Sequence, residues 1–173
     1  TYGSKAKSEK RKVKSENILD IWITVKLSKL ICEVTHDLDA YAMDEAARKI
    51  ESFVDDLSRW YIRRSRRRFQ QPQSQEDLEQ ASNTLREVLL TLSKMLAPFT
   101  PFFAEGLYAS LKHENPATNL KNIEGGIPLR RDIKTLEQET GTQNSVHLCD
   151  WPEFDRNIQD EDLLVSMEEV RRL

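Results

Sequence analysis

Residues 17–38 read NILDIWITVKLSKLICEVTHDL, and their apolar side chains recur at intervals of three and four residues. These intervals place the side chains on one face of an α-helix, whereas a half-buried strand would alternate at every second residue. The predicted face consists of Leu19, Ile23, Leu27, Leu30, Val34 and Leu38. Asn17 is a suitable N-cap, and Asp20 falls in the first turn, where the helix dipole favours an acidic side chain. The segment therefore predicts an amphipathic helix that ends near Ala40 and packs against other helices.

Three later segments repeat this periodicity and predict three more helices. The second is expected to begin at an Asp44 N-cap, after a short connection at 41–43, and to run into an arginine-rich sequence. Its predicted buried face consists of Ala47, Ile50, Val54, Leu57 and Tyr61. The third follows a Ser74 cap and ends before Pro98, with a buried face of Leu78, Ala81, Leu85, Val88, Leu92 and Met95. The fourth runs from Pro101 to about Lys112, with a buried face of Phe103, Leu107 and Leu111.

The connections between these helices are short, and short connections favour antiparallel neighbours. Residues 17–112 are therefore predicted to form an all-α, antiparallel four-helix bundle. We expect residues 1–16 to be a basic arm or connector, residues 113–144 an irregular insertion, and residues 145–173 a C-terminal extension. This extension should contain an extended stretch at 145–148 and a last helix that starts near Asp160 or Asp162 and reaches Leu173. The chain begins at Thr1 and its last helix has no stop signal, as expected of a fragment of a longer protein.

The composition excludes several classes of protein. Of the 173 residues, 38% are hydrophobic and 32% are charged, and no apolar run approaches the ~20 residues of a membrane span. Five glycines and six prolines are too few for a turn-rich β sandwich. The two cysteines, Cys32 and Cys149, lie far apart without a CxxC motif, which disfavours a disulfide scaffold or a cysteine zinc site. We therefore expect a helical protein of the reducing cytoplasm that has no membrane segment.

Charge is segregated along the chain, although the net charge is only -3. Residues 1–14 hold six Lys and Arg against one Glu, residues 59–68 hold six Arg and no acid, and residues 153–169 hold seven acids against one Arg. Aromatic residues flank the arginines in WYIRRSRRRF, residues 60–69. Rings beside guanidinium groups are what unstacked RNA bases and their phosphates require, so this segment favours an RNA-binding surface. The alternative is structural: the arginines would pair with the acidic C-terminal segment or with another domain.

The sequence contains no recognisable catalytic constellation. His36, His113 and His147 lie on different predicted elements, and none is spaced to activate a nucleophile. Gly125 and Gly126 lack the strand–turn–helix context of a phosphate-binding loop. We therefore predict no catalytic, cofactor or metal site in this chain.

Four segments occur in a recognisable order: ENILDIWI at 16–23, DEAARKIESFVDDLSRWYIRRSRRRF at 44–69, LLTLSKMLAPFTPFFAEGLY at 89–108 and SVHLCDWPE at 145–153. Together they resemble the anticodon-binding helical domain of the class I aminoacyl-tRNA synthetases, which is an antiparallel helical bundle. The WYIRRSRRRF stretch makes the isoleucyl enzymes the most similar members. The valyl, leucyl and methionyl relatives share the bundle and the LAPFTPF-like turn, and they remain alternatives.

The resemblance implies a role within a larger enzyme. A catalytic domain absent from this chain would use ATP with Mg²⁺ to attach isoleucine to its tRNA, and a Zn²⁺ site would lie in another absent domain. This chain would hold the anticodon stem-loop of isoleucine tRNA and contact the catalytic domain of the same longer chain. A monomer without membrane contact is expected.

The resemblance and the charge pattern together identify candidate RNA-binding residues. Those expected at phosphates or base edges are Arg59, Arg63, Arg64, Arg66, Arg67 and Arg68, and those expected to stack on bases are Trp60 and Phe69. A helix of 3.6 residues per turn cannot turn all six arginines to one RNA, but Arg59, Arg63 and either Arg66 or Arg67 share one face. The family commonly has Trp directly after the position of Phe69, where this chain has Gln70, so Phe69 or Trp60 would have to supply the stacking.

Overall fold

The computed structural model describes residues 17–112, 145–153 and 160–172, and every regular element in these ranges is helical. The elements are α1 (Ile18–Asp39), α2 (Met43–Asp56), the π-helical η1 (Leu57–Ile62), α3 (Arg63–Gln70), α4 (Gln75–Leu96), α5 (Pro101–Lys112), the 3₁₀ turn η2 (Val146–Leu148) and α8 (Glu161–Arg172). This confirms the predicted all-α fold. The predicted arm at 1–16 and insertion at 113–144 lie outside the described residues.

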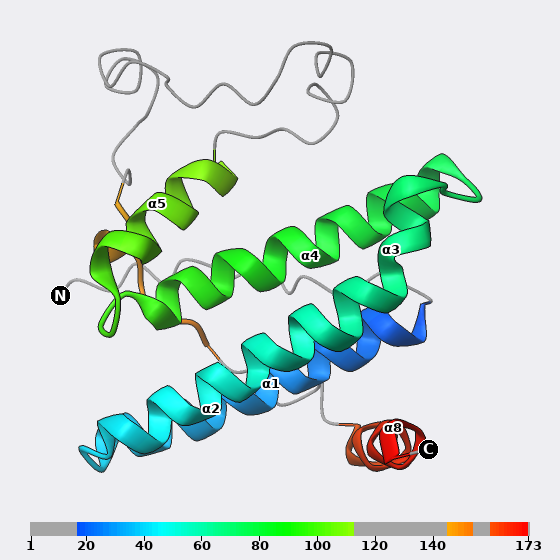
Figure 1. The fold of residues 1–173 in the computed structure, drawn as a ribbon. Helices are drawn as coiled ribbons and strands as arrows, with labels where there is room; N and C mark the ends of the chain where they lie inside the picture. Colours follow the sequence, from blue (N-terminus) through cyan, green and yellow to red (C-terminus); the bar gives the residue numbers. More distant parts are fainter. Residues whose placement is uncertain (1–16, 113–144, 154–159, 173) are drawn as a thin grey trace, which may run out of the picture.

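The helices form an antiparallel bundle (Figure 1). α1 and α2 lie side by side, and α2 continues through η1 into α3, so that the end of this long helix returns to the start of α1. α4 contacts α3 at its own beginning and packs along α1, and α5 folds back against α4. α8 lies against α1. No helix in the described ranges is long and apolar enough to cross a membrane.

Local signals placed several helix ends correctly. The Asn17 side-chain oxygen accepts a hydrogen bond from the backbone N–H of Leu19 at 3.0 Å, and Ser74 Oγ accepts one from Asp77 N–H at 3.1 Å, which confirms both predicted caps. The predicted Asp44 cap is wrong. The left-handed backbone of Tyr41, with φ of 60°, turns the chain earlier, and Ala42 becomes the N-cap without a side-chain bond.

The core surrounds α1, which contributes Trp22, Ile23, Leu27, Leu30 and Val34. The predicted α1 face is confirmed, with Leu19 and Leu38 at its edge. The predicted face of the second helix is partly wrong, because Ala46 and Phe53 are buried in place of Ala47 and the 39% exposed Val54. Burying the ring of Phe53 removes more apolar surface from water than burying Val54 would.

The predicted buried face of α5 is also wrong in part. Ala104 and Tyr108 are buried, whereas Phe103 is 62% exposed and Phe102 is 94% exposed. The C-terminal segment explains this rotation, because Glu105 accepts hydrogen bonds from Ser145 Oγ at 3.0 Å and from Val146 N–H at 2.9 Å. These contacts hold residues 145–148 as a short 3₁₀ turn, where the sequence predicted an extended stretch.

The last helix follows its prediction closely. α8 spans Glu161–Arg172, and Asp160 Oδ1 accepts a hydrogen bond from Leu163 N–H at 2.9 Å, which makes Asp160 the cap. Trp151 connects residues 145–153 to α1, because its indole N–H donates a hydrogen bond to Thr35 Oγ1 at 2.9 Å. The described parts of the C-terminal extension are therefore held against the bundle.

The π-helical turn η1 determines which side of the long helix faces the core beyond Leu57. Phe53, Leu57, Tyr61 and Ser65 are all buried, although they are separated by three consecutive intervals of four residues. In a regular α-helix each such interval drifts by about 40°, so the fourth residue would have turned by ~120°. The wider turns of a π-helix absorb this drift. As a result, Ser65 and the arginines around it keep a fixed orientation relative to the bundle.

Candidate nucleic-acid interface

The arginine run occupies η1 and α3, at the end of the long helix that lies beside the beginnings of α1 and α4. Ser65 is fully buried, and it fixes the opposite side of α3 as the exposed side. In a regular helix Arg63 and Arg67 lie about 40° apart on the side opposite Ser65, and Arg66 lies about 60° from Arg63 at the edge of that side. All three are exposed.

The pairing of the exposed arginines is sparse. Arg59 forms an i,i+4 ion pair with Asp55 at 2.7 Å, and Arg66 Nε donates to the Gln70 side chain at 3.1 Å. Within the described part of the chain, no ion pair joins Arg63, Arg64, Arg66 or Arg67 to an acidic side chain, whether in α8 or elsewhere. These four guanidinium groups therefore keep their charge available to an anionic ligand.

Arg68, which was predicted to contact RNA, is directed into the bundle instead. Its two Nη atoms donate to the two carboxylate oxygens of Asp20 at 2.8 and 3.0 Å, and Nε donates to Asp77 at 2.7 Å. The Asp20 side chain is fully buried and also accepts a hydrogen bond from the Tyr61 hydroxyl at 2.8 Å. This buried network joins the end of α3 to the first turns of α1 and α4. Arg68 therefore positions the exposed arginines.

Burial and hydrogen bonding shift the pKa values of two members of the network. Burial alone would lower the pKa of Arg68, but its hydrogen bonds to Asp20 and Asp77 outweigh burial and raise it. Burial raises the pKa of Tyr61, and the charge of Asp20 and its hydrogen bond raise it further. Both groups therefore keep their protons throughout the physiological range, and the network is always formed from a guanidinium, a phenol and two acidic side chains.

The two aromatic candidates are half-buried. The Arg64 guanidinium lies over the Trp60 ring, with 3.9 Å between its Cζ and the ring centroid. This is a cation–π contact, and it covers part of the ring that a base would need for direct stacking. A base can instead stack on the outer plane of Arg64, because guanidinium planes also serve as stacking surfaces for RNA. Phe69 lies beside Arg68, near the end of α3.

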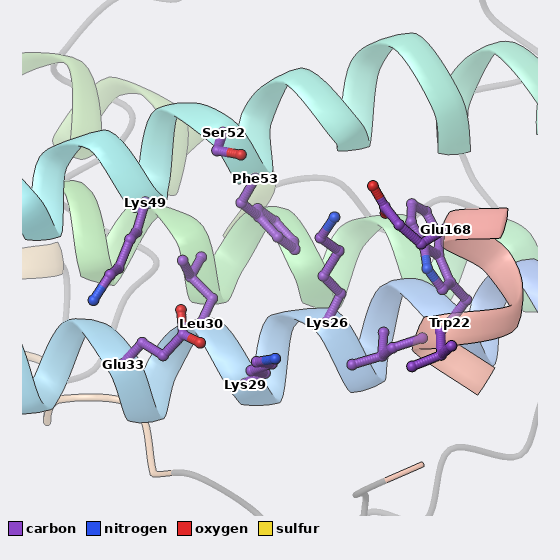
Figure 2. Close-up of a pocket in the computed structure, with 11 residues that line it drawn as sticks. Trp22, Lys26, Lys29, Leu30, Glu33, Lys49, Ser52, Phe53 and Glu168 are labelled. Carbon is purple, nitrogen blue, oxygen red and sulfur yellow. The ribbon is translucent and has the colours of Figure 1, made fainter. Parts of the chain in front are cut away.

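A second candidate feature is an open groove of about 390 Å³ between α1, α2 and α8 (Figure 2). Trp22, Leu30 and Phe53 line it together with three lysines. Two of these lysines are already paired, Lys26 with Asp56 and Lys49 with Asp37. The hydrogen bond from Lys49 lowers the pKa of Asp37, so this pair stays ionised at neutral pH. The groove therefore lacks the excess of positive charge that the α3 surface has, and the described residues hold no cluster of metal-ligating side chains.

Comparison with known proteins places the chain in a family. The family model described as "Anticodon-binding domain of tRNA ligase" matches residues 20–173. The chain therefore belongs to the anticodon-binding domain family of the tRNA ligases, which confirms the resemblance seen in the sequence motifs.

The similar curated proteins that we compared are isoleucine–tRNA ligases. The chain is 42% identical over 154 residues to that of Clostridium novyi, in an alignment that covers 89% of this chain and 13% of the relative. It is 42% identical over 145 residues to that of Dehalococcoides mccartyi, covering 84% and 12%. It is 36% identical over 156 residues to that of Thermus thermophilus, covering 90% and 13%. The chain thus spans only 12–13% of the length of these relatives.

Proposed function

We propose that this chain is the tRNA-binding domain of an isoleucine–tRNA ligase, and that it holds the anticodon stem-loop of isoleucine tRNA against the exposed side of α3. The observation that carries the proposal is the row of Arg63, Arg66 and Arg67, which are exposed and have no acidic partner in the described ranges. Phosphate contacts supply most of the affinity in protein–nucleic acid complexes, and unpaired guanidinium groups form them well. The family and the similar ligases support the choice of tRNA.

The structural alternative for the arginine run is not favoured. In its first form the arginines pair with the acidic C-terminal segment, yet the ion pairs that the run forms within the described residues go to Asp55, Asp20 and Asp77. In its second form they pair with another domain of a longer protein, and the RNA-binding test below separates that form from the proposal. Among those pairs, the one that Arg68 makes with Asp20 is buried. The remaining arginines would gain little from being on the surface unless a ligand binds there, because exposed charges contribute little to stability.

The proposal includes a longer protein that carries out the chemistry elsewhere. In it, a catalytic domain uses ATP with Mg²⁺ to charge isoleucine tRNA in the cytoplasm, a Zn²⁺ site lies in a further domain, and the protein acts as a monomer. The small share of the relatives that this chain covers supports such a division of roles. The described residues of this chain contribute binding and positioning.

The test is the binding of this chain to a fluorescent anticodon stem-loop of isoleucine tRNA at several salt concentrations. Replacing both Arg63 and Arg67 by Ala should lower the slope of log K against log [salt] by roughly 1.5, since each phosphate contact contributes ~0.7–0.9. The matched control replaces two exposed cations on the other half of the bundle, Lys29 and Arg48, by Ala. This control should keep the wild-type slope.

A second arm tests the choice of tRNA. A stem-loop with the valine anticodon should bind more weakly than the isoleucine stem-loop at the same salt concentration, because base contacts carry the sequence preference. Equal binding by the double arginine variant and the control would refute the α3 surface. Equal binding of the two stem-loops would refute the assignment to isoleucine tRNA.

A further inference from the structure

The last turn of α8 brings two more cations to the region of η1. The segment 153–169 is acidic, but α8 ends in Arg171 and Arg172, and Arg172 is exposed. α8 packs against α1, and Met167 is buried in the core. Figure 2 shows Glu168 of α8 beside Trp22 and Lys26, at one end of the groove. The basic end of α8 is therefore held next to the helix that carries the arginine run.

Arg171 reaches across to the end of α2 and to η1. Its Nη2 donates to a carboxylate oxygen of Asp56, and its Nη1 lies 3.5 Å from Glu168 Oε2. Its Cζ lies 5.6 Å from the centroid of the Trp60 ring, the same ring that Arg64 covers at 3.9 Å. Two guanidinium groups from distant segments of the chain thus converge on one indole.

The charges around this ring do not cancel. Asp56 is shared between Arg171 and Lys26, whose Nζ donates to its other oxygen. Arg64 has no acidic partner among the described residues. The Glu168 side chain is 54% exposed, and its Oε2 lies 3.5 Å from Arg171 Nη1, so it neutralises Arg171 only weakly. Three cations therefore face one buried carboxylate and one exposed one. Like charges repel, and an anion bound beside both guanidinium groups would relieve that repulsion.

We propose that the last turn of α8 is part of the RNA-binding surface, and that Arg64 and Arg171 together hold one RNA phosphate beside the Trp60 ring. The inference rests on the proposed function and extends it to a second segment of the chain. Both guanidinium groups present the planar donor geometry that suits a phosphate. Arg64 also belongs to α3, directly after Arg63, so the site continues the exposed arginine surface. Asp56 would then hold Arg171 in place until RNA competes for it.

The test measures stem-loop binding against salt for Arg171→Ala, Arg171→Lys and Asp56→Asn. Arg171→Ala should reduce the salt slope by ~0.7–0.9, the value of one phosphate contact. Arg171→Lys keeps the positive charge and can still pair with Asp56, so the salt slope should be unchanged. The affinity should fall in part, because Lys lacks the planar, two-pronged donor geometry of a guanidinium group. Asp56→Asn removes the internal competitor and should bind RNA more tightly than wild type. All variants are compared below their melting temperatures, with Arg48→Ala as the exposed-cation control.

A purely structural role for Arg171 predicts a different pattern. Asp56→Asn and Arg171→Ala would then both lower the melting temperature, the salt slope would stay at its wild-type value, and Asp56→Asn would not bind more tightly. That pattern would overturn the inference while leaving the proposed function intact, provided that the Arg63 and Arg67 variant still loses its slope. The last measurement repeats the binding in the presence of inorganic phosphate at constant ionic strength. If millimolar phosphate alone removes the contribution of Arg171 to the salt slope, the ligand is free phosphate and the RNA assignment fails.

Discussion

Arg68→Ala removes the central cation of the network that joins α3 to α1 and α4. The Arg68 side chain is 11% exposed, and the carboxylate of Asp20 that it contacts is 0% exposed. After the substitution, Asp20 would keep the Tyr61 hydroxyl as a donor but would lose both hydrogen bonds from the guanidinium. The buried carboxylate would then lose the positive charge of Arg68 that lies beside it in the wild type.

The expected cost follows from that burial. Removing one partner of a buried ion pair costs ~3–5 kcal/mol, because the remaining charge is desolvated without compensation. The remaining Tyr61 bond and the partial exposure of Asp77, at 27%, place this case at the lower end of that range, or about 3 kcal/mol. For a domain of this size, 1 kcal/mol corresponds to ~2–4 °C in melting temperature, so we expect a loss on the order of 10 °C.

The measurement is thermal and urea unfolding, followed by circular dichroism at pH 7. Arg67→Ala is the matched control, since it removes a neighbouring but exposed arginine and should change the stability by no more than ~0.5 kcal/mol. Asp20→Asn in the Arg68→Ala background removes the uncompensated charge and should recover roughly 1 kcal/mol.

Two outcomes would refute this reasoning. If Arg68→Ala melts within a degree or two of Arg67→Ala, the buried network does not hold the helix end. If Asp20→Asn gives no recovery in the Arg68→Ala background, the loss does not arise from the Asp20 carboxylate left without Arg68.

Three further predictions test other parts of the bundle. Deletion of Ser58 should turn η1 into regular α-helix while the helix on both sides still faces the core, so it should lower the melting temperature by only a few degrees. Deletion of Glu51, before the π turn, rotates the preceding half of the helix by ~100° and should lower the melting temperature far more. Burial alone would raise the pKa of Asp56, but the hydrogen bonds from Lys26 and Arg171 outweigh it and lower that pKa below its usual value. At low pH the unfolded chain therefore binds more protons than the folded one. The stability that the ionised Asp56 contributes is present above pH ~4 and is lost as the pH falls through the folded pKa. The acid-unfolding curve of Asp56→Asn should lack this pH-dependent loss of stability. Trp151→Phe removes the hydrogen bond to Thr35 and should destabilise the domain by about 1 kcal/mol in urea unfolding, whereas an unchanged midpoint would show that residues 145–153 do not depend on this bond.

Much of the fold was predictable because each helix carries its own local signals. The intervals of three and four residues in α1 and α4, together with the Asn17 and Ser74 caps, depend only on residues within one or two turns. The same holds for the charge of the arginine run, which is a property of consecutive residues. Errors arose where two adjacent apolar residues competed for one buried position, as with Val54 and Phe53. Periodicity alone does not choose between such neighbours, because the choice depends on the helix packed against them.

Some features of the candidate site likewise depend on neighbouring residues, and others depend on residues far away in the sequence. The order of residues is sufficient to predict a helical bundle with a cluster of arginines at the end of its second helix, and the motifs indicate the family. The inward direction of Arg68 depends on packing, because Asp20 is 48 residues away in sequence, and Arg171 reaches Asp56 across 115 residues. Local backbone geometry fixes a helix, but the direction in which a long cationic side chain points is fixed by the carboxylates and rings that packing brings within hydrogen-bonding distance.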